Sequence, residues 1–179
     1  MKLVSLLERL EYTCLQGTTD QEVKNVIYDS RKVEEGSLFI CIRGAVVDGH
    51  KFVPDVVAKG AKVLVVEEAV EAPEDVTVIL VKDTRYAMAF ISAAYFGYPA
   101  EKLKTIGITG TKGKTTTTYM VKSILENAGY KVGLIGTIEA IIGDRKIPAK
   151  NTTPESYMVQ EYFHEMVEAG CDCVVMEVS

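Results

Sequence analysis

The chain has 179 residues, 47% of them hydrophobic, with 20 Lys+Arg against 25 Asp+Glu and a net charge of −5. This composition is that of an ordinary folded chain of one or two domains, and it excludes long disordered tracts and collagen-like repeats. Because the charge is negative and no run of Lys or Arg exceeds two residues, we expect no nucleic-acid partner. Apolar runs stay far below the roughly 20 residues that cross a bilayer, and Glu8, Arg9 and Glu11 interrupt the N-terminal one, so we expect no membrane and a cytoplasmic location.

The first half of the chain is predicted to alternate short strands with helices. Apolar spacing predicts helices near residues 3–10, 51–59 and 85–96, and β-branched or aromatic runs predict strands at 26–28, 38–42, 63–66 and 76–81. Gly97-Tyr98-Pro99 then ends the last of these helices, and a new strand pattern begins at Lys104. We therefore place a domain boundary there, which gives a small α/β domain at 1–98 and a second domain at 99–179.

The second half is predicted to be the first part of a parallel-sheet domain. A strand is expected at 105–109, a turn at 110–113, a helix at 114–128 and a strand at 131–135, and an irregular stretch continues to Pro154. A helix at 155–169 and a strand at 173–178 complete the pattern. Strands that alternate with helices of this length predict an α/β fold with right-handed crossovers.

The turn between the first strand and helix of this domain has the composition of a phosphate-binding loop. Two glycines allow the backbone to curl so that successive N–H groups point inward, toward the positive end of the following helix. Lys114 can reach the β- and γ-phosphates of ATP, and the Thr115 hydroxyl can ligate Mg²⁺. A strict G-x-x-x-x-G-K-[ST] motif requires glycine at position 108, where this chain has Ile108, so we interpret the turn as a variant P-loop. It consists of Gly110, Thr111, Lys112, Gly113, Lys114, Thr115 and Thr116.

Glu177 is a second candidate for the metal site. It lies at the carboxyl end of the strand predicted at 173–178, and ligands of open parallel sheets bind outside the carboxyl ends of the strands. Glu177 can therefore join Thr115 around Mg²⁺, or it can be a solvated acid at a strand end.

Several segments together resemble the Mur ligases of bacterial cell-wall synthesis, and among them the MurE-type ligases. The resemblance extends over the whole chain, so no single motif carries it. The segments are Asp29-Ser30-Arg31, Gly36-Ser37-Leu38-Phe39, Asp48-Gly49-His50-Lys51-Phe52, Gly60-Ala61, Gly107 to Thr116, Asn151-Thr152-Thr153-Pro154 and Met176-Glu177-Val178-Ser179.

The resemblance implies an ATP-dependent ligase that adds a diamino acid, L-lysine or meso-diaminopimelate, to UDP-N-acetylmuramoyl-L-alanyl-D-glutamate through an acyl phosphate. It implies that residues 1–98 bind the UDP-N-acetylmuramoyl group, with Tyr28 and Ser30 at the uridine nucleotide. Residues 99–179 would begin the central ATP-binding domain, in which Lys114, Thr115 and Glu177 act in catalysis. The muramoyl-peptide part would contact Asn151, Thr152, Thr153 and Ser179.

Some of these residues also have a purely structural interpretation. Thr153 and Pro154 can form the first turn of the following helix, with Thr153 as its cap. Ser30 can be an ordinary turn residue after a strand.

The resemblance also implies that more strands and a third domain follow in the family, so we expect the 179-residue chain alone to have no synthetase activity. Three other functions stay in view at this point. They are a MurF-type or related amide ligase, a non-catalytic nucleotide-binding module, and a P-loop phosphotransferase without a nucleotide-sugar domain.

Overall fold

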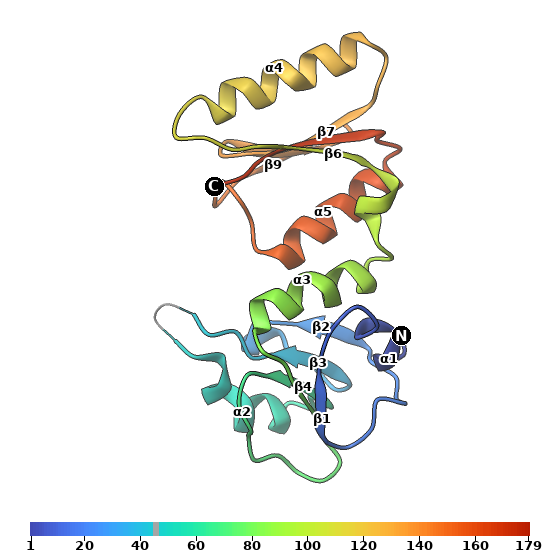
Figure 1. Ribbon diagram of the computed structural model, residues 1–179, viewed down its shortest axis with the longest axis vertical. Coiled ribbons are helices and arrows are strands. Elements are labelled where there is room, and N and C mark those ends of the chain that lie inside the picture. Colours follow the sequence, from blue (N-terminus) through green and yellow to red (C-terminus); the bar gives the residue numbers. More distant parts are fainter. Residues whose placement is uncertain (45–46) are drawn as a thin grey trace. The chain divides into compact units, whose positions relative to one another are not determined.

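The computed structural model describes residues 1–44 and 47–179, and the chain divides into two compact units, Met1–Tyr95 and Phe96–Ser179. Both units are α/β, as predicted (Figure 1). The sequence pattern placed the boundary after residue 98, whereas the division by packing falls before Phe96. Within the described ranges, no helix has both the length and the apolar character that a membrane span needs.

The first unit is built on a five-stranded sheet in the order β1-β5-β4-β3-β2. Strands β2 to β5 are parallel, and β1 is antiparallel to β5. Short 3₁₀ helices η1 and η2 follow β2 and precede α2. The elements are α1 (Leu3–Leu6), β1 (Thr13–Gln16), β2 (Asn25–Ile27), η1 (Ser30–Lys32), β3 (Ser37–Ile40), η2 (Gly49–Phe52), α2 (Val53–Ala58), β4 (Val63–Val66), β5 (Thr77–Leu80) and α3 (Thr84–Tyr95).

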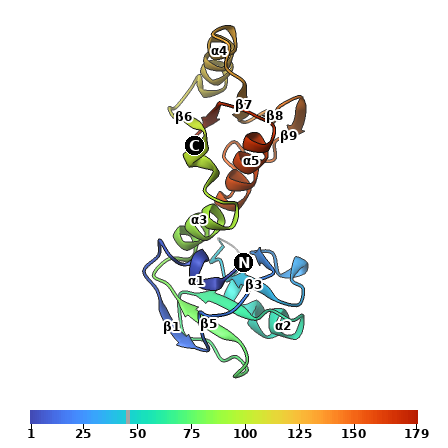
Figure 2. The same ribbon diagram turned by 90° about the vertical axis from the view of Figure 1, so that its right-hand side faces the viewer.

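Helices cover both faces of this sheet (Figures 1 and 2). Alternate residues of a strand point to opposite faces, so Phe39 and Leu64 face α2, where they pack with Val56 in one core cluster. Leu38 and Ile40 point to the other face, which α1 and α3 cover, and both are fully buried. Strands buried on both faces explain why β3 and β4 are continuous apolar runs rather than alternating ones.

The second unit has a five-stranded sheet in the order β6-β10-β7-β8-β9. The strands β6, β10 and β7 are parallel, and β8 and β9 are antiparallel additions beyond β7. Helix α4 packs on one face through Val121 and Leu125, and α5 packs on the other through Phe163 and Met166 (Figure 1). The elements are η3 (Pro99–Lys102), β6 (Lys104–Ile108), α4 (Lys114–Asn127), β7 (Val132–Ile135), β8 (Glu139–Ile142), β9 (Arg145–Pro148), α5 (Ser156–Glu168) and β10 (Cys173–Glu177).

The structure corrects the sequence prediction at three places. The stretch predicted as irregular contains the hairpin β8–β9, whose turn at Gly143 and Asp144 is a Gly-Asp pair of the kind that joins antiparallel strands. Strand β1 was not predicted, because its residues are mostly exposed and carry no apolar alternation. Helix α5 begins at Ser156 with Glu155 at its N-cap, so Thr153 does not cap it.

Candidate functional site

The glycine-rich turn connects the end of β6 to the start of α4 and forms an open bend of main-chain amides. Gly110 has φ 146° and Gly113 has φ 78°, values that side chains with a Cβ atom rarely adopt. Within the described part of the chain, the amides of residues 111–116 make no hydrogen bond to any group outside α4. Because α4 has 14 residues, its N-terminus also carries the partial positive charge of a full helix dipole. The bend therefore has the open amides that an anion site requires, and anion binding at this turn stays a prediction.

The Lys114 ammonium lies over this bend. Its Nζ atom donates a hydrogen bond of 2.8 Å to the carbonyl oxygen of Gly110. The Lys114 carbonyl in turn accepts a hydrogen bond from the hydroxyl of Thr118, a fully buried residue of α4. A single positive charge is thus held at the mouth of the turn, where the phosphates of a nucleotide would lie.

Glu177 is fully buried at the end of β10, and three donors surround its carboxylate. The hydroxyl of Thr115 donates to Oε2 over 3.0 Å, and the hydroxyl of Thr137 donates to the same oxygen over 3.0 Å. The main-chain N–H of Thr137 donates to Oε1 over 2.9 Å. An ionised carboxylate in a buried position is stable only with such partners, so the pairing of Thr115 with Glu177 replaces the reading of a solvated acid.

Sheet order explains how these residues meet. Strand β10 lies between β6 and β7, and all three are parallel, so their carboxyl ends share one edge of the sheet. The glycine turn follows β6, Glu177 ends β10, and Thr137 follows β7. Thr137 was not among the residues singled out from the sequence. Its position directly after a buried strand was the available signal.

Gly136 is required by the close approach of this carboxylate. A Cβ atom on Gly136 would lie 2.5 Å from Oε1 of Glu177, a distance that no real side chain tolerates. The glycine therefore allows the turn after β7 to lie against the buried acid.

The segment 151–153 and Ser179 reach the same edge of the sheet. The Thr153 hydroxyl donates to the carbonyl of Glu177 over 3.0 Å and accepts from the Ser179 N–H over 2.9 Å. Thr152 Oγ1 lies 3.1 Å from Thr137 Oγ1. Asn151 is exposed and its side chain makes no hydrogen bond within the described residues. The structure thus brings Thr152 to Thr137 and links Thr153 and Ser179 to the main chain of Glu177, and it leaves the Asn151 amide open to solvent.

The donor set at this edge suits Mg²⁺ in the presence of phosphate. Among the described residues, no three His, Cys, Asp or Glu side chains converge on a common point. Mg²⁺ keeps several waters and is usually bound through one or two carboxylates together with substrate phosphates. One carboxylate, Glu177, and the hydroxyl of Thr115 beside an open phosphate turn fit that requirement.

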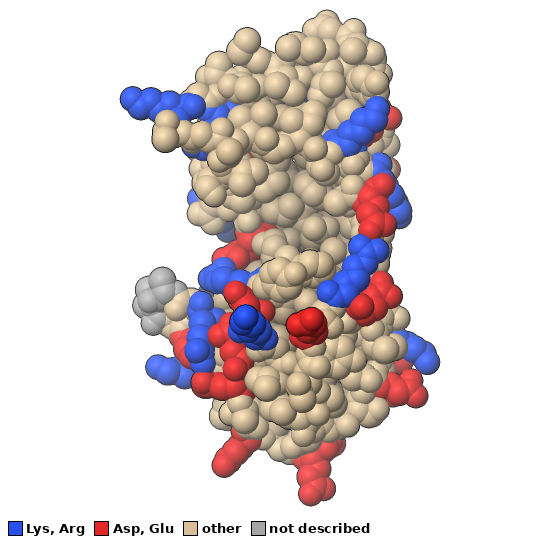
Figure 3. Space-filling model, in the orientation of Figure 1, with Lys and Arg blue, Asp and Glu red and all other residues tan. Residues whose placement is uncertain are grey.

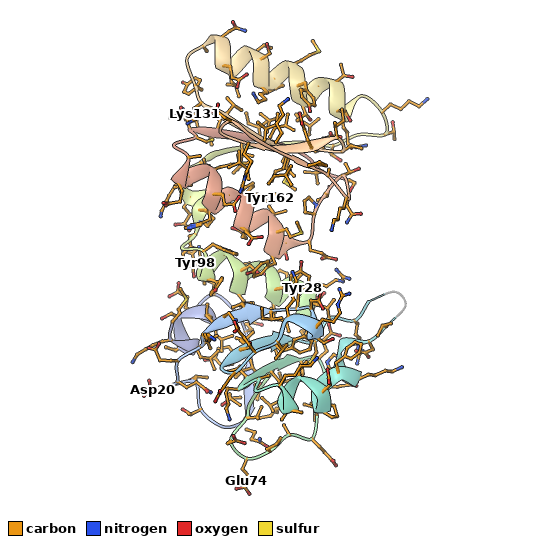
Figure 4. All side chains as sticks on the ribbon, turned by 180° about the vertical axis from the view of Figure 1, so that it is seen from behind. Asp20, Tyr28, Glu74, Tyr98, Lys131 and Tyr162 are labelled. Atoms are coloured by element: carbon orange, nitrogen blue, oxygen red, sulfur yellow. The ribbon has the colours of Figure 1, made fainter. Side chains whose placement is uncertain are left out.

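A second candidate site lies in the first unit, in a pocket of about 480 Å³. Tyr28 and Ser30, the two residues predicted there, both line it. Tyr28, just after β2, is labelled in Figure 4. The Ser30 carbonyl accepts from Lys59 Nζ over 3.0 Å, and its hydroxyl has no partner in the part of the chain that the structure describes. The full lining is Tyr28, Asp29, Ser30, Arg31, Phe39, Ile42, Gly44, Val47, Gly49 and Phe52.

Two polar anchors hold the loops around this pocket. The Asp29 carboxylate accepts from the Arg31 main chain and guanidinium, and these hydrogen bonds lower the pKa of Asp29 to about 2. His50 is buried, and its Nε2 accepts from the Glu67 N–H over 3.0 Å, so Nδ1 carries the proton that it shares with Asp48 over 2.6 Å. His50 therefore ties η2 to Glu67, the residue after β4.

Charged side chains do not gather into a patch of one sign on the face that Figure 3 shows. Basic and acidic residues are interspersed there. The first unit also has ion pairs such as Lys62–Asp75 and Lys24–Glu34. This mixed pattern agrees with the net charge of −5 and offers no broad electrostatic footprint on that face.

Comparison with known proteins assigns both units. A family model described as the Mur ligase family, catalytic domain, matches residues 22–96, and one described as the Mur ligase middle domain matches residues 108–179. Over its whole length the chain is 53% identical to the UDP-N-acetylmuramoyl-L-alanyl-D-glutamate–2,6-diaminopimelate ligase of Clostridium perfringens and 50% identical to that of Clostridium tetani. The chain belongs to the Mur ligase family.

The match to these Mur ligases is partial on their side. The chain spans 37% of the C. perfringens protein and 38% of the C. tetani protein. The fold is also that of a solved UDP-N-acetylmuramoyl-L-alanyl-D-glutamate–2,6-diaminopimelate ligase, with a TM-score of 0.79 and 21% identity over 100% of this chain and 36% of that one. Mur ligases are ATP-dependent, which agrees with the sequence interpretation of the glycine-rich turn in the second unit as a variant P-loop.

Proposed function

We propose that this chain belongs to an ATP-dependent ligase of peptidoglycan precursor synthesis. The reaction would join a diamino acid to UDP-N-acetylmuramoyl-L-alanyl-D-glutamate, and the names of the two Clostridium relatives favour 2,6-diaminopimelate over lysine. Because its substrate would be a soluble UDP-linked precursor, the proposal includes the cytoplasm as the compartment.

In this function the second unit binds ATP and the metal ion. The amides of Gly110 to Thr116 hold the phosphates, and Lys114 exchanges the Gly110 carbonyl for the β- and γ-phosphate oxygens. Thr115 and Glu177 hold the Mg²⁺ ion, which would offset the charge that gathers on the transferred phosphoryl group.

The chemistry follows from the weakness of a carboxylate as an electrophile. Transfer of the γ-phosphoryl group of ATP to the terminal carboxylate of the substrate yields ADP and an acyl phosphate. The amine of the diamino acid then attacks the acyl carbon, and the tetrahedral intermediate expels inorganic phosphate to leave the amide. The turn and Lys114 contribute by holding the phosphoryl group in place and by stabilising its charge.

The remaining predicted residues have binding roles in this proposal. Tyr28 and Ser30 would contact the uridine nucleotide in the 480 Å³ pocket of residues 1–98. The muramoyl-peptide part would contact Asn151, the two threonines after it and Ser179. Hydroxyl and amide side chains suit carbonyl and phosphate oxygens because they donate hydrogen bonds without adding charge.

The observation that carries the proposal is the buried Glu177 carboxylate, held by Thr115 of the phosphate turn. A non-catalytic nucleotide module would not require a buried acid at the phosphate end of its turn. The MurF-type alternative is disfavoured by identities of 53% and 50% to two diaminopimelate ligases.

Calorimetric titration of the chain with ATP and Mg²⁺ tests the ATP site. We expect Lys114→Ala to weaken binding by about 10- to 100-fold, since hydrogen bonds to charged groups contribute about 1.5–3 kcal/mol. Lys122→Ala is the matched control, because Lys122 lies two turns further along α4 and is paired with Glu126. Its affinity should equal that of the unsubstituted chain.

Two results would contradict the proposal. The first is no ATP binding by the unsubstituted chain at millimolar concentrations of nucleotide and Mg²⁺. The second is an ATP affinity that Lys114→Ala leaves unchanged, which is the behaviour expected of a nucleotide module that does not grip the phosphates.

A further inference from the structure

Thr137 makes two hydrogen bonds to Glu177 from a position that no sequence motif marks. Its N–H reaches Oε1 at 2.9 Å and its hydroxyl reaches Oε2 at 3.0 Å, so both carboxylate oxygens are engaged by one residue. A donor pair of this kind fixes the plane of a carboxylate, because rotation about the last side-chain bond breaks at least one of the two hydrogen bonds.

The direction of the hydroxyl protons follows from the chemistry of the acceptors. The Thr137 oxygen lies 3.0 Å from Glu177 Oε2 and 3.1 Å from Thr152 Oγ1, but a hydroxyl has a single proton. An ionised carboxylate can only accept, so Thr137 donates to Glu177 and accepts from Thr152. The loop that contains Thr152 is thereby connected to the buried acid through the Thr137 hydroxyl.

The turn that carries Thr137 is itself anchored to the phosphate-binding helix. The Gly136 N–H donates to the Glu139 carbonyl over 3.1 Å, which closes the turn. The Glu139 carboxylate accepts from the Tyr119 hydroxyl over 3.0 Å and pairs with Lys146 over 3.3 Å. Tyr119 lies one helical turn after Thr115 in α4, so both Thr115 and Thr137 are positioned from the same helix.

Because Glu177 is fully buried, the direction of its carboxylate depends on its hydrogen-bond donors. Glu177 accepts three hydrogen bonds, and a carboxylate has about four acceptor sites. Three donors therefore leave about one lone-pair position for a further partner, and they leave it in a fixed direction. Removal of one donor frees the carboxylate to turn.

We propose that Thr137 is a positioning residue that orients Glu177 toward the divalent cation of the nucleotide site. The inference rests on the proposed function, because it assumes that Glu177 faces Mg²⁺ bound with ATP. Thr137 would act through Glu177 without touching the nucleotide, so its effect should appear only when the metal is present.

The experiment compares ATP binding by the chain with and without Mg²⁺, using calorimetry in saturating MgCl₂ and in excess EDTA. Thr137→Val keeps the side-chain shape and the N–H donor of this exposed residue and removes only its hydroxyl, and binding in EDTA reports whether the variant is folded. We expect it to weaken ATP binding about 10-fold in Mg²⁺, the lower range for loss of a partner of a metal ligand, and to leave binding in EDTA unchanged. Thr137→Ser, which keeps the hydroxyl, should restore the Mg²⁺-dependent affinity.

The outcomes separate this inference from the proposed function. If Thr137→Val binds ATP in Mg²⁺ as tightly as the unsubstituted chain, or weakens binding equally in Mg²⁺ and EDTA, the positioning role is overturned while the ATP site stands. If the unsubstituted chain fails to bind ATP at all, the proposed function and the inference fall together.

Discussion

The two candidate sites are built in different ways on similar scaffolds. In the second unit, the phosphate turn consists of main-chain amides and glycines, and its polar groups lie at the ends of three adjacent parallel strands. In the first unit, the pocket is formed by side chains on η1, η2 and the loops beside them. A site made of backbone constrains which residues can occupy it, whereas a site made of side chains constrains mainly its shape.

The largest expected effects are on the free energy of unfolding, and they test whether the sheets of the two units depend equally on their buried cores. Leu64 in β4 and Leu134 in β7 are both fully buried in parallel strands, one in each unit. Leu64→Ala and Leu134→Ala should each lower the free energy of unfolding by about 2–5 kcal/mol, because both leave a cavity in a packed core. Urea denaturation measures the change.

Leu15→Ala is the control for this pair, because Leu15 is 44% exposed in the edge strand β1 and should change stability by less than about 0.5 kcal/mol. A loss above 2 kcal/mol in only one of the two core variants would break the equivalence of the scaffolds.

A smaller effect on stability is expected where Gly136 lies against the Glu177 carboxylate in the second unit. Gly136→Ala would place a Cβ atom 2.5 Å from Glu177 Oε1, so we expect a loss of about 1–3 kcal/mol in the free energy of unfolding and weaker Mg²⁺-dependent ATP binding. Gly107→Ala is the matched control, since its Cβ would meet only Val178 Cγ2, at 3.4 Å. Equal stability of the two variants would show that the carboxylate yields without cost.

The first site should respond more weakly to loss of a single group, because shape and many side chains share the binding. Ser30→Ala removes a hydroxyl that has no partner among the described residues. We expect it to weaken binding of uridine diphosphate about 3- to 10-fold, the range for one neutral hydrogen bond of about 0.5–1.5 kcal/mol. Ser5→Ala, at an exposed position of α1, serves as the control in the same fluorescence or calorimetric titration. Equal affinities would remove Ser30 from the pocket's binding groups.

The smallest effect concerns the anchor beside that pocket. The pKa of Asp29 falls from 3.8 to about 2 in the folded chain, mainly because of the Arg31 side chain. A lowered pKa means that the ionised Asp29 stabilises the fold above about pH 4, and that this contribution is lost as the pH falls toward 2. Asp29→Asn should therefore differ from the unsubstituted chain in urea midpoint at pH 6, and the difference should shrink between pH 4 and pH 2. A difference that stays constant with pH would contradict the assignment.

Sequence reasoning recovered the parts of the fold that have strong periodicity. Helix α4 and strand β10 were predicted to within one residue at each end, and the strand at 63–66 matches β4. The hairpin β8–β9 was missed although Gly143-Asp144 follows the apolar residues of β8, because β9 is mostly polar and exposed. Strand β1 had no signal, because it is held by pairing with β5 rather than by burial.

The candidate site was predictable where the backbone sets the geometry and not where neighbouring strands create it. The glycine turn and the closeness of Thr115 to Glu177 were expected from their positions at strand ends, and the direct hydrogen bond between them was not. Thr137 also follows a buried strand, but its contact with Glu177 depends on β10 inserting between β6 and β7, a sheet order that local sequence does not encode. Tertiary contacts also explain why Thr153 does not cap α5. Its hydroxyl instead donates to the Glu177 carbonyl and accepts from the Ser179 N–H.

In the proposed ATP site, the contact between the Lys114 ammonium and the Gly110 carbonyl would set a cost for every incoming phosphate. The Lys114 ammonium already donates a hydrogen bond to a neutral carbonyl oxygen of its own turn. Binding of a nucleotide there would therefore exchange that carbonyl for a phosphate oxygen and would not add a partner to an unpaired charge. The measured affinity for ATP would then be a difference between two ammonium contacts, and the hydrogen bond from Lys114 to Gly110 would hold the curvature of the turn when no phosphate is bound.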